Sequence, residues 1–200
     1  MLVALYWCLS TPNFFILFNT VTLVMPSVPA AWDGLPPASL EVTAAWSTLP
    51  RATAFLVHGF RLAVHCVTGE IRILQSVQVC DASTILNPMQ ARGQVESGIA
   101  QGIGTTLFER MVLDDHGAVI NSTLRNYRIP AFADITRSEV FFAKTNDPYG
   151  PLGAKPFGES PVIPVSAASG NALADATGLR FTSLPFSADR IYGQLAELGK

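Results

Sequence analysis

The sequence predicts an α+β fold in which antiparallel hairpins pack against helices. Two β-rich runs stand on either side of a Thr-Gly turn, which is typical of a β-hairpin. Farther along the chain, small and apolar residues recur at helical spacing. Because strands arrive in pairs joined by turns before helices follow, this order favours the α+β class.

Composition limits the kinds of partner that the chain can have. Its 200 residues suit one domain or a large part of one, and the net charge is −2 with 14% charged residues. The sequence has no run of Lys and Arg residues that would bind a phosphate backbone, so we do not expect nucleic acid as a partner. The scattered Cys8, Cys66 and Cys80 predict neither a zinc site nor a disulfide scaffold. A hydrophobic content of 49% suggests apolar surface covered by a partner or by further sequence.

The N-terminal segment is atypical. Residues 1–32 carry no charge, and Phe14–Met25 is apolar. No Lys or Arg begins the segment, a polar stretch interrupts it, and neither half reaches the roughly 20 residues of a membrane span. Val28–Ala30 keeps an export signal open, beside a displaced start or translated upstream sequence. We assign residues 1–36 to this segment and residues 37–200 to the domain, and expect a cytoplasmic protein, with a periplasmic or membrane-associated one as the alternative.

The first predicted strands form a hairpin. Ser39–Trp46 alternates like a strand, and Ala54–Val67 reads as another. A tight turn at Thr68–Gly69 leads into a third strand over Ile71–Val79.

Three histidines invite a metal hypothesis that their spacing opposes. His58 and His65 are seven residues apart on one predicted strand, so they should point to opposite faces and not share a site. We expect each to be solvated or hydrogen-bonded. His116 lies in Asp114–Gly117, which predicts an exposed hairpin turn rather than a cation site.

A glycine-rich helix is predicted over Gln94–Arg110, where apolar residues recur at helical spacing. Gly98 and Gly102 lie on one face of it, which indicates close packing against a neighbouring helix. Gln94 and Gln101 are two helical turns apart, and their amides suit a ligand rich in carbonyls and ring nitrogens. Surface or capping glutamines are the alternative interpretation.

The second half of the chain mixes strands and helices. Ala118–Leu124 and Ser138–Thr145 are predicted strands. A helix is expected over Ala167–Ala176, and a short one over Ser187–Glu197 closes the chain.

Glu159 stands between a glycine and a Ser-Pro turn, directly before the first of these helices. A carboxylate there feels the positive end of the helix. It can simply offset unpaired backbone N–H groups, or it can be a general base whose proton affinity is raised by partial burial. The spacing alone leaves both interpretations open.

Two motifs carry a resemblance to a known family. Gly153–Glu159 looks like the Gly-X-Lys-X-X-Gly-Glu signature near the C-terminus of molybdenum-binding subunits of the xanthine dehydrogenase and aldehyde oxidase family. Upstream, Asn87–Gly104 is similar to the Asn-Pro, Gly-Gln-X-Glu-Gly and Gln-Gly block of that family. The likeness covers roughly Ala38–Leu195, although Ser83 stands where the family has a glycine.

The resemblance implies part of a C-terminal molybdenum-cofactor-binding domain, in an oxidoreductase that hydroxylates an aldehyde or N-heterocycle with oxygen from water. Glu159 corresponds to the general base and Gln94 to a neighbour of the molybdenum centre, whereas Gln101 is expected to contact the pterin. Lys155 and Gly158 form the frame of the carboxylate. The implied cofactor is molybdenum-molybdopterin, with a cytosine dinucleotide as one form, and the metal is held through the pterin without a direct protein ligand.

Subunits of this family are several times longer, and this chain has no set of iron–sulfur cysteines. We therefore expect a fragment that needs the upstream part of a molybdenum subunit, together with iron–sulfur clusters and FAD on partner domains or subunits. The alternative is a non-catalytic truncated relic or interaction module, in which Glu159 serves only as a charge at a helix start.

Overall fold

The structure is a computed structural model that describes residues 7–9, 54–156 and 158–197. The chain divides into two compact units, and one of them, Phe15–Arg51, lies wholly outside the described residues. The predicted strand Ser39–Trp46 and the boundary at residue 36 therefore lie outside the described residues as well.

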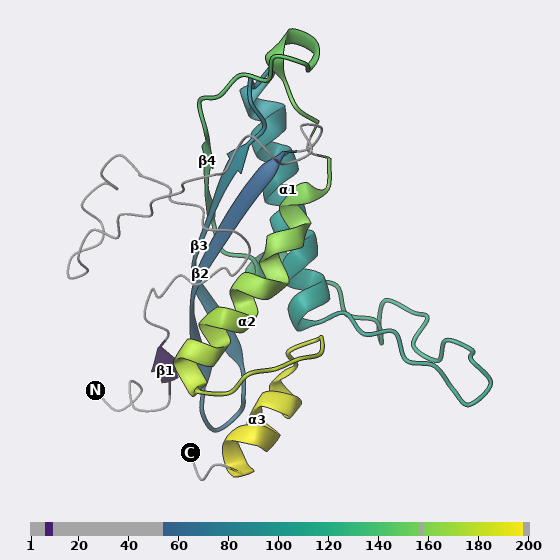
Figure 1. Cartoon of the computed structure of the whole chain (residues 1–200). Coiled ribbons are helices and arrows are strands. Elements are labelled where there is room, and N and C mark those ends of the chain that lie inside the picture. Colours follow the sequence, from purple (N-terminus) through teal and green to yellow (C-terminus); the bar gives the residue numbers. More distant parts are fainter. Residues whose placement is uncertain (1–6, 10–53, 157, 198–200) are drawn as a thin grey trace. The chain divides into compact units, whose positions relative to one another are not determined.

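The described residues form a mixed four-stranded sheet with the order β1-β2-β3-β4. Its strands are β1 (Trp7–Leu9), β2 (Phe55–His65), β3 (Ile71–Asp81) and β4 (Ser138–Phe142) (Figure 1). The predicted β2–β3 hairpin is confirmed, and Gly69 turns it with a φ of 71° that suits glycine.

The prediction that all strands form antiparallel hairpins is wrong for β4. This strand pairs with β3 in parallel. Parallel neighbours need a long crossover, and the chain between Asp81 and Ser138 supplies one. The predicted strand over Ala118–Leu124 is wrong: only an isolated bridge joins Leu113 to Val119 there. The α+β class is confirmed, with one parallel pairing among the hairpin strands.

The glycine-rich helix α1 (Pro88–Leu107) begins six residues before the predicted start at Gln94. Asn87 caps it, since its side chain accepts a hydrogen bond from the Gln90 N–H at 3.1 Å, and Pro88 suits the first helical position. The Asn-Pro pair is therefore the start of the helix.

Two further helices follow the sheet. The prediction for Ala167–Ala176 is confirmed within a longer helix, α2 (Ile163–Thr177), and Gly178 ends it with a φ of 78°. The final helix, α3 (Ala188–Glu197), is also confirmed. No helix in the described ranges is long and apolar enough to cross a membrane.

A single hydrophobic core joins β2 and β3 to the three helices. α2 packs along β2, and α1 packs along α2 (Figure 1). The fully buried members come from every layer: Leu62, Val64, Cys80, Val95, Ile99, Ile103, Val165, Leu173, Ile191 and Leu195. The sheet and helices therefore bury one another's apolar faces.

The predicted face of small residues on α1 is in tight contact. A Cβ atom added at Gly98 would lie 2.6 Å from the Cβ of Pro161, and one added at Gly102 would lie 2.6 Å from the Cβ of Val165. Neither position has room for a methyl group. The two glycines thus set how closely α1 approaches the segment that contains Glu159 and begins α2.

The segment between α1 and β4, residues 109–137, projects from the sheet and helices as a long loop (Figure 1), which we name the arm. The predicted exposed turn at its tip is confirmed, because the Asp114 carboxylate accepts from the His116 and Ala118 N–H groups at 2.9 and 2.8 Å. At its base, the Tyr127 hydroxyl donates to Glu109 at 2.7 Å.

A buried ion pair ties the end of β3 to the loop before Glu159. Lys155 Nζ lies 3.1 Å from Asp81 Oδ2, and the two side chains are 13% and 6% exposed. The other oxygen, Asp81 Oδ1, accepts from the Ser83 N–H and from the Thr145 hydroxyl. Ser83 takes a φ of 57°, which explains why a glycine was expected there.

We predict that Gly102→Ala lowers the free energy of unfolding by about 1–3 kcal/mol, because the new methyl group must displace the buried Val165. The control is Gly93→Ala in the same helix, where an added Cβ meets no atom within 4 Å. It should raise the free energy of unfolding by about 0.5–1 kcal/mol. Urea denaturation of both variants measures the difference, and equal effects would contradict the packing argument.

We predict that Lys155→Met lowers the free energy of unfolding by about 3–5 kcal/mol, because it leaves the buried Asp81 carboxylate without its cation. Lys144→Met removes an exposed lysine of the same strand-and-loop region and should change stability by less than about 0.5 kcal/mol. Adding Asp81→Asn to Lys155→Met should recover part of the loss, and a double variant less stable than the single one would refute the ion-pair explanation.

Candidate active site

Glu159 stands directly before the 3₁₀ helix η4 (Ser160–Val162), which runs into α2. Its placement at a helix start agrees with the prediction, but its side chain is exposed, whereas the base interpretation expected partial burial. The carboxylate makes no hydrogen bond or ion pair with any residue that the structure describes. It is therefore open to a ligand or to another part of a protein.

Gln94 reaches the peptide unit that carries Glu159. Its Nε2 donates to the carbonyl of Gly158 at 2.6 Å, and that carbonyl belongs to the peptide bond between Gly158 and Glu159. Gly158 takes a φ of 43°, and an added Cβ there would meet no atom within 4 Å. The structure thus brings together three of the predicted site residues, Gln94, Gly158 and Glu159.

A second glutamine, Gln78, which the sequence analysis did not identify, binds the same turn from the buried side of the sheet. Gln78 of β3 is fully buried, and its Nε2 donates to the carbonyl of Pro161 at 2.9 Å. The turn from Gly158 to Pro161 therefore carries an amide on each side, one exposed and one buried. The signal in the sequence was a polar residue between two valines of the predicted strand, at the position two residues after Ser76 and therefore on the same face.

Gln78 belongs to a buried row of polar side chains on the sheet. Its partner across the hairpin is His58, whose Nε2 lies 3.1 Å from Ser76 Oγ, and Ser76 lies 2.9 Å from Ser138 Oγ. Burial lowers the pKa of His58 to about 3, so the ring is neutral near pH 7. His65 Nδ1 lies 3.0 Å from Thr68 Oγ1, so each of these two histidines has a hydrogen-bond partner, as expected.

Lys155 and Gln101 are placed differently from Gln94. The Lys155 amine is paired with Asp81, so it holds the loop rather than the Glu159 carboxylate. Its backbone N–H donates to the Ala82 carbonyl at 3.0 Å. Gln101 is exposed on α1, and among the described residues no hydrogen bond joins its side chain to the Glu159 turn.

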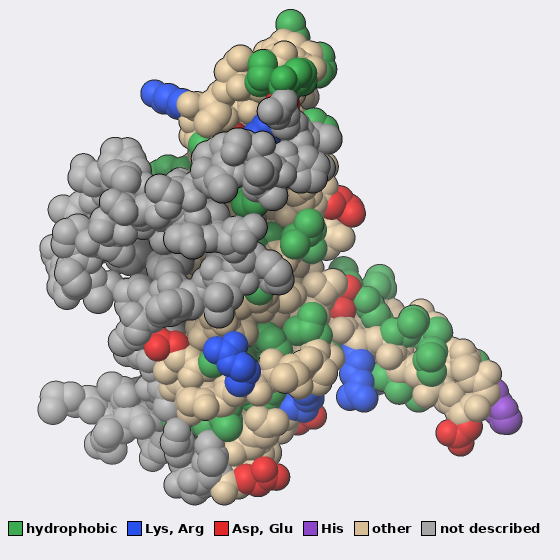
Figure 2. Space-filling view, viewed as in Figure 1, with side chains coloured by type: hydrophobic (Ala, Val, Ile, Leu, Met, Phe, Trp, Pro, Cys, Tyr) green, Lys and Arg blue, Asp and Glu red, His purple; other side chains and the backbone are tan. Residues whose placement is uncertain are grey.

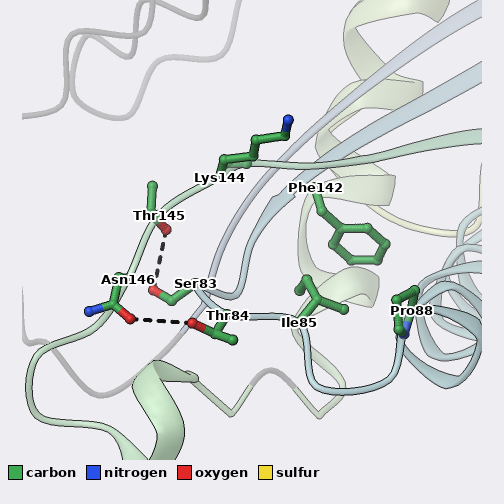
Figure 3. A pocket seen from close by; sticks show the side chains of 9 residues that line it. Ser83, Thr84, Ile85, Pro88, Phe142, Lys144, Thr145 and Asn146 are labelled. Atoms are coloured by element: carbon green, nitrogen blue, oxygen red, sulfur yellow. Dashed lines mark hydrogen bonds between the residues drawn. The ribbon is translucent and has the colours of Figure 1, made fainter.

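A groove of about 640 Å³ lies between the turn before α1 and the chain after β4 (Figure 3). One end is apolar, with Ile85, Pro88 and Phe142. At the other end Thr84 donates to Asn146 at 3.3 Å, and hydroxyl groups of Ser83 and Thr145 lie 3.3 Å apart. Sequence reasoning did not find this groove, because its walls come from segments about 60 residues apart.

The chemistry of the turn suits a ligand held by hydrogen bonds. Within the described residues no group of three or more His, Cys, Asp or Glu side chains is placed to hold a metal ion. The turn instead offers an exposed amide, an exposed carboxylate and open main chain, from Gln94, Glu159 and Gly158. Such donors and acceptors fit the organic part of a cofactor rather than a bare metal.

Comparison with known proteins gives a family. Residues 30–136 match the model of the molybdopterin cofactor-binding domain. The chain is 37% identical over 148 residues to the aldehyde oxidoreductase molybdenum-binding subunit PaoC of Escherichia coli strain K12, covering 73% of this chain and 20% of PaoC. It is 39% identical over 132 residues to the putative xanthine dehydrogenase molybdenum-binding subunit XdhA of the same strain, covering 66% of this chain and 18% of XdhA.

Solved structures agree with these similarities. The crystal structure of quinoline 2-oxidoreductase from Pseudomonas putida 86 matches with a TM-score of 0.67 and 33% identity, over 70% of this chain and 18% of that one. The chain thus spans about a fifth of the length of these relatives. Since the family model covers more than half of the sequence, the chain belongs to the molybdopterin cofactor-binding domain of the molybdenum-binding subunits of the xanthine dehydrogenase and aldehyde oxidase family.

Proposed function

We propose that this chain supplies the general-base turn of a molybdenum hydroxylase, with Glu159 as the base. One observation carries the proposal: the turn around Glu159 is fixed by amides at Gly158 and Pro161, while the carboxylate itself is left unbonded among the described residues. A general base must be held in place and yet be free to accept a proton. This turn meets both requirements.

The residues of the chain have separate tasks. Glu159 accepts a proton at a carboxylate oxygen. Gln94, which already holds the Gly158 carbonyl through Nε2, offers its amide oxygen to a polar group beside the carboxylate. Gly158 allows close approach because no side chain stands there, and Gln101 contacts the pterin from the next turns of α1. Molybdenum-molybdopterin, when bound, supplies the two-electron oxidation of the substrate carbon.

The names of the relatives support a substrate class for this proposal. PaoC is an aldehyde oxidoreductase subunit, and quinoline is an N-heterocycle. We assign this chain to the hydroxylation of an aldehyde or N-heterocycle with oxygen from water. The cytosine dinucleotide form of the pterin, and iron–sulfur clusters and FAD on partner domains or subunits, belong to the same proposal.

An exposed base needs cover, because a carboxylate in bulk water is a weak base. The cover comes from the upstream part of a molybdenum subunit, since this chain spans about a fifth of its relatives. The expectation of a fragment rests on this argument. The cytoplasmic location stays a prediction, because residues 1–32 lie almost wholly outside the described residues.

The arm is the surface on which the upstream part docks. Figure 2 shows hydrophobic side chains gathered along it, and seven large ones are exposed: Met111, Leu113, Val119, Ile120, Leu124, Ile129 and Phe132. Phe132 is 99% exposed and Leu124 is 79% exposed. Apolar surface of this kind is characteristic of an interface.

A non-catalytic interaction module is the second candidate, and the same arm favours it, because docking through the arm does not depend on Glu159. In that case Glu159 is only a charge at a helix start. A relic without chemistry would keep the fold and lose the cofactor. Metal content and turnover separate these candidates.

We predict that Glu159→Gln abolishes turnover without loss of metal. The full chain is produced together with the upstream four-fifths of PaoC, and molybdenum per complex is measured beside the oxidation of an aromatic aldehyde. The variant should keep its molybdenum and lose turnover by about 100-fold or more, because the amide cannot accept the proton.

The matched control is Glu70→Gln, which removes an exposed glutamate at the turn between β2 and β3. It should leave turnover within about twofold of the original chain, because the position lies outside both motifs and on the surface. Molybdenum without any loss of turnover in Glu159→Gln would refute the base. Absence of molybdenum from every sample would favour the relic.

We predict that Leu124→Asp and Phe132→Asp together weaken capture of the upstream PaoC fragment by at least tenfold, because two charges enter an apolar interface. Both positions are exposed in the chain, so its own stability should stay unchanged. Ser122→Asp adds a charge at an exposed polar position of the arm and should not affect capture. Equal capture of all variants would exclude the arm as the docking surface.

A further inference from the structure

We propose that Gln78 is a positioning residue for Glu159: its buried amide fixes the Pro161 carbonyl and so sets the direction of the carboxylate two residues earlier. The inference rests on the proposed function of Glu159 and extends it to a residue inside the sheet. Gln78 is 0% exposed, and its Nε2 donates to Pro161 O at 2.9 Å across 83 residues of sequence.

The geometry of the turn makes this bond effective. The Val162 N–H donates to the Glu159 carbonyl at 3.0 Å, which closes a single turn of η4. Gly98 packs against Pro161 from α1, but that contact is apolar and has no direction. The bond from Gln78 is directional, so it fixes the rotation of the turn as well as its distance from the core.

Energetics argue against a purely structural role. Gln78 Oε1 is buried without a hydrogen-bond partner, and so is Nδ1 of His58, its partner across the hairpin. A buried polar atom without a hydrogen-bond partner destabilises the folded state. Methionine has a similar volume and no polar atom that needs a partner, so for packing alone it would suit position 78 better than glutamine. A need for its N–H donor explains why the position carries an amide.

The side chain across the hairpin from Gln78, His58, is itself fixed by its neighbours and is uncharged near pH 7. The His58 ring stacks on Phe60 with centroids 4.1 Å apart and bonds Ser76 through Nε2. The side chain of His58 is buried, with 1% of its surface exposed. The Gln78 amide therefore lies in a fixed and neutral environment.

The test uses Gln78→Met in the full chain without cofactor. Hydrogen exchange at the Val162 amide reports the turn, because that N–H closes η4. We expect exchange there to become at least about tenfold faster, with the melting temperature unchanged or raised. Gln75→Met is the matched control on the same strand, because Gln75 bonds the Glu139 carboxylate at 3.0 Å rather than the turn. It should leave Val162 exchange unchanged.

The second readout uses the complex with the upstream PaoC fragment. Gln78→Met should lower kcat by about 10- to 100-fold, with KM and molybdenum content unchanged, because the base is displaced while binding is intact. Faster Val162 exchange with no turnover in any complex, the original chain included, would support positioning and refute the proposed function.

Two results would overturn the role of Gln78. One is unchanged Val162 exchange in Gln78→Met, and the other is a lowered melting temperature with faster exchange throughout the sheet. Should the variant not fold, NMR of the original chain decides the question. The Gln78 side-chain amide protons should exchange slowly and show nuclear Overhauser effects to Pro161 or Val162, and their absence would refute the hydrogen bond.

Discussion

The close approach of α1 to the chain after Glu159 is the constraint on which the rest of the structure depends. At Gly98 and Gly102 the backbone of α1 lies against Pro161 and Val165, with no room for a Cβ atom. Close-packed interiors tolerate little change in volume, so these two contacts fix the separation of the two helical segments. At this separation Gln94 on the same helix reaches the Gly158 carbonyl.

Features that depend on local patterns could be predicted from the sequence. The Thr-Gly turn between two β-rich runs gave the hairpin, and helical periodicity gave α1 and α2. The contacts of Gly98 and Gly102 followed from their spacing on one helical face. Gln94 and Glu159 came from short motifs, and the structure brings them to one turn through the hydrogen bond from Gln94 to the Gly158 carbonyl.

Features that depend on distant pairing could not be predicted. The parallel pairing of β4 is set by the long connection through α1 and the arm, whose turn resembled that of a hairpin. Lys155 finds Asp81 across 74 residues, and no local pattern indicates that pair. The alternation of side chains along β3 can predict that Gln78 is buried, but it cannot predict that its partner is the Pro161 carbonyl. The exposure of Glu159 depends on whether another chain covers the turn. The periodicity of this sequence cannot predict such a contact.

The choice of neutral donors around Glu159 is consistent with a base. A cation close to a carboxylate favours its charged form and weakens it as a proton acceptor. Lys155 is the cation of the same motif, but its ammonium group is paired with the buried Asp81 carboxylate. Gln94 and Gln78 hold the turn through carbonyl oxygens of the main chain, so they fix the position of Glu159 without neutralising its charge. An arginine or lysine at either position would hold the turn as firmly and oppose proton transfer.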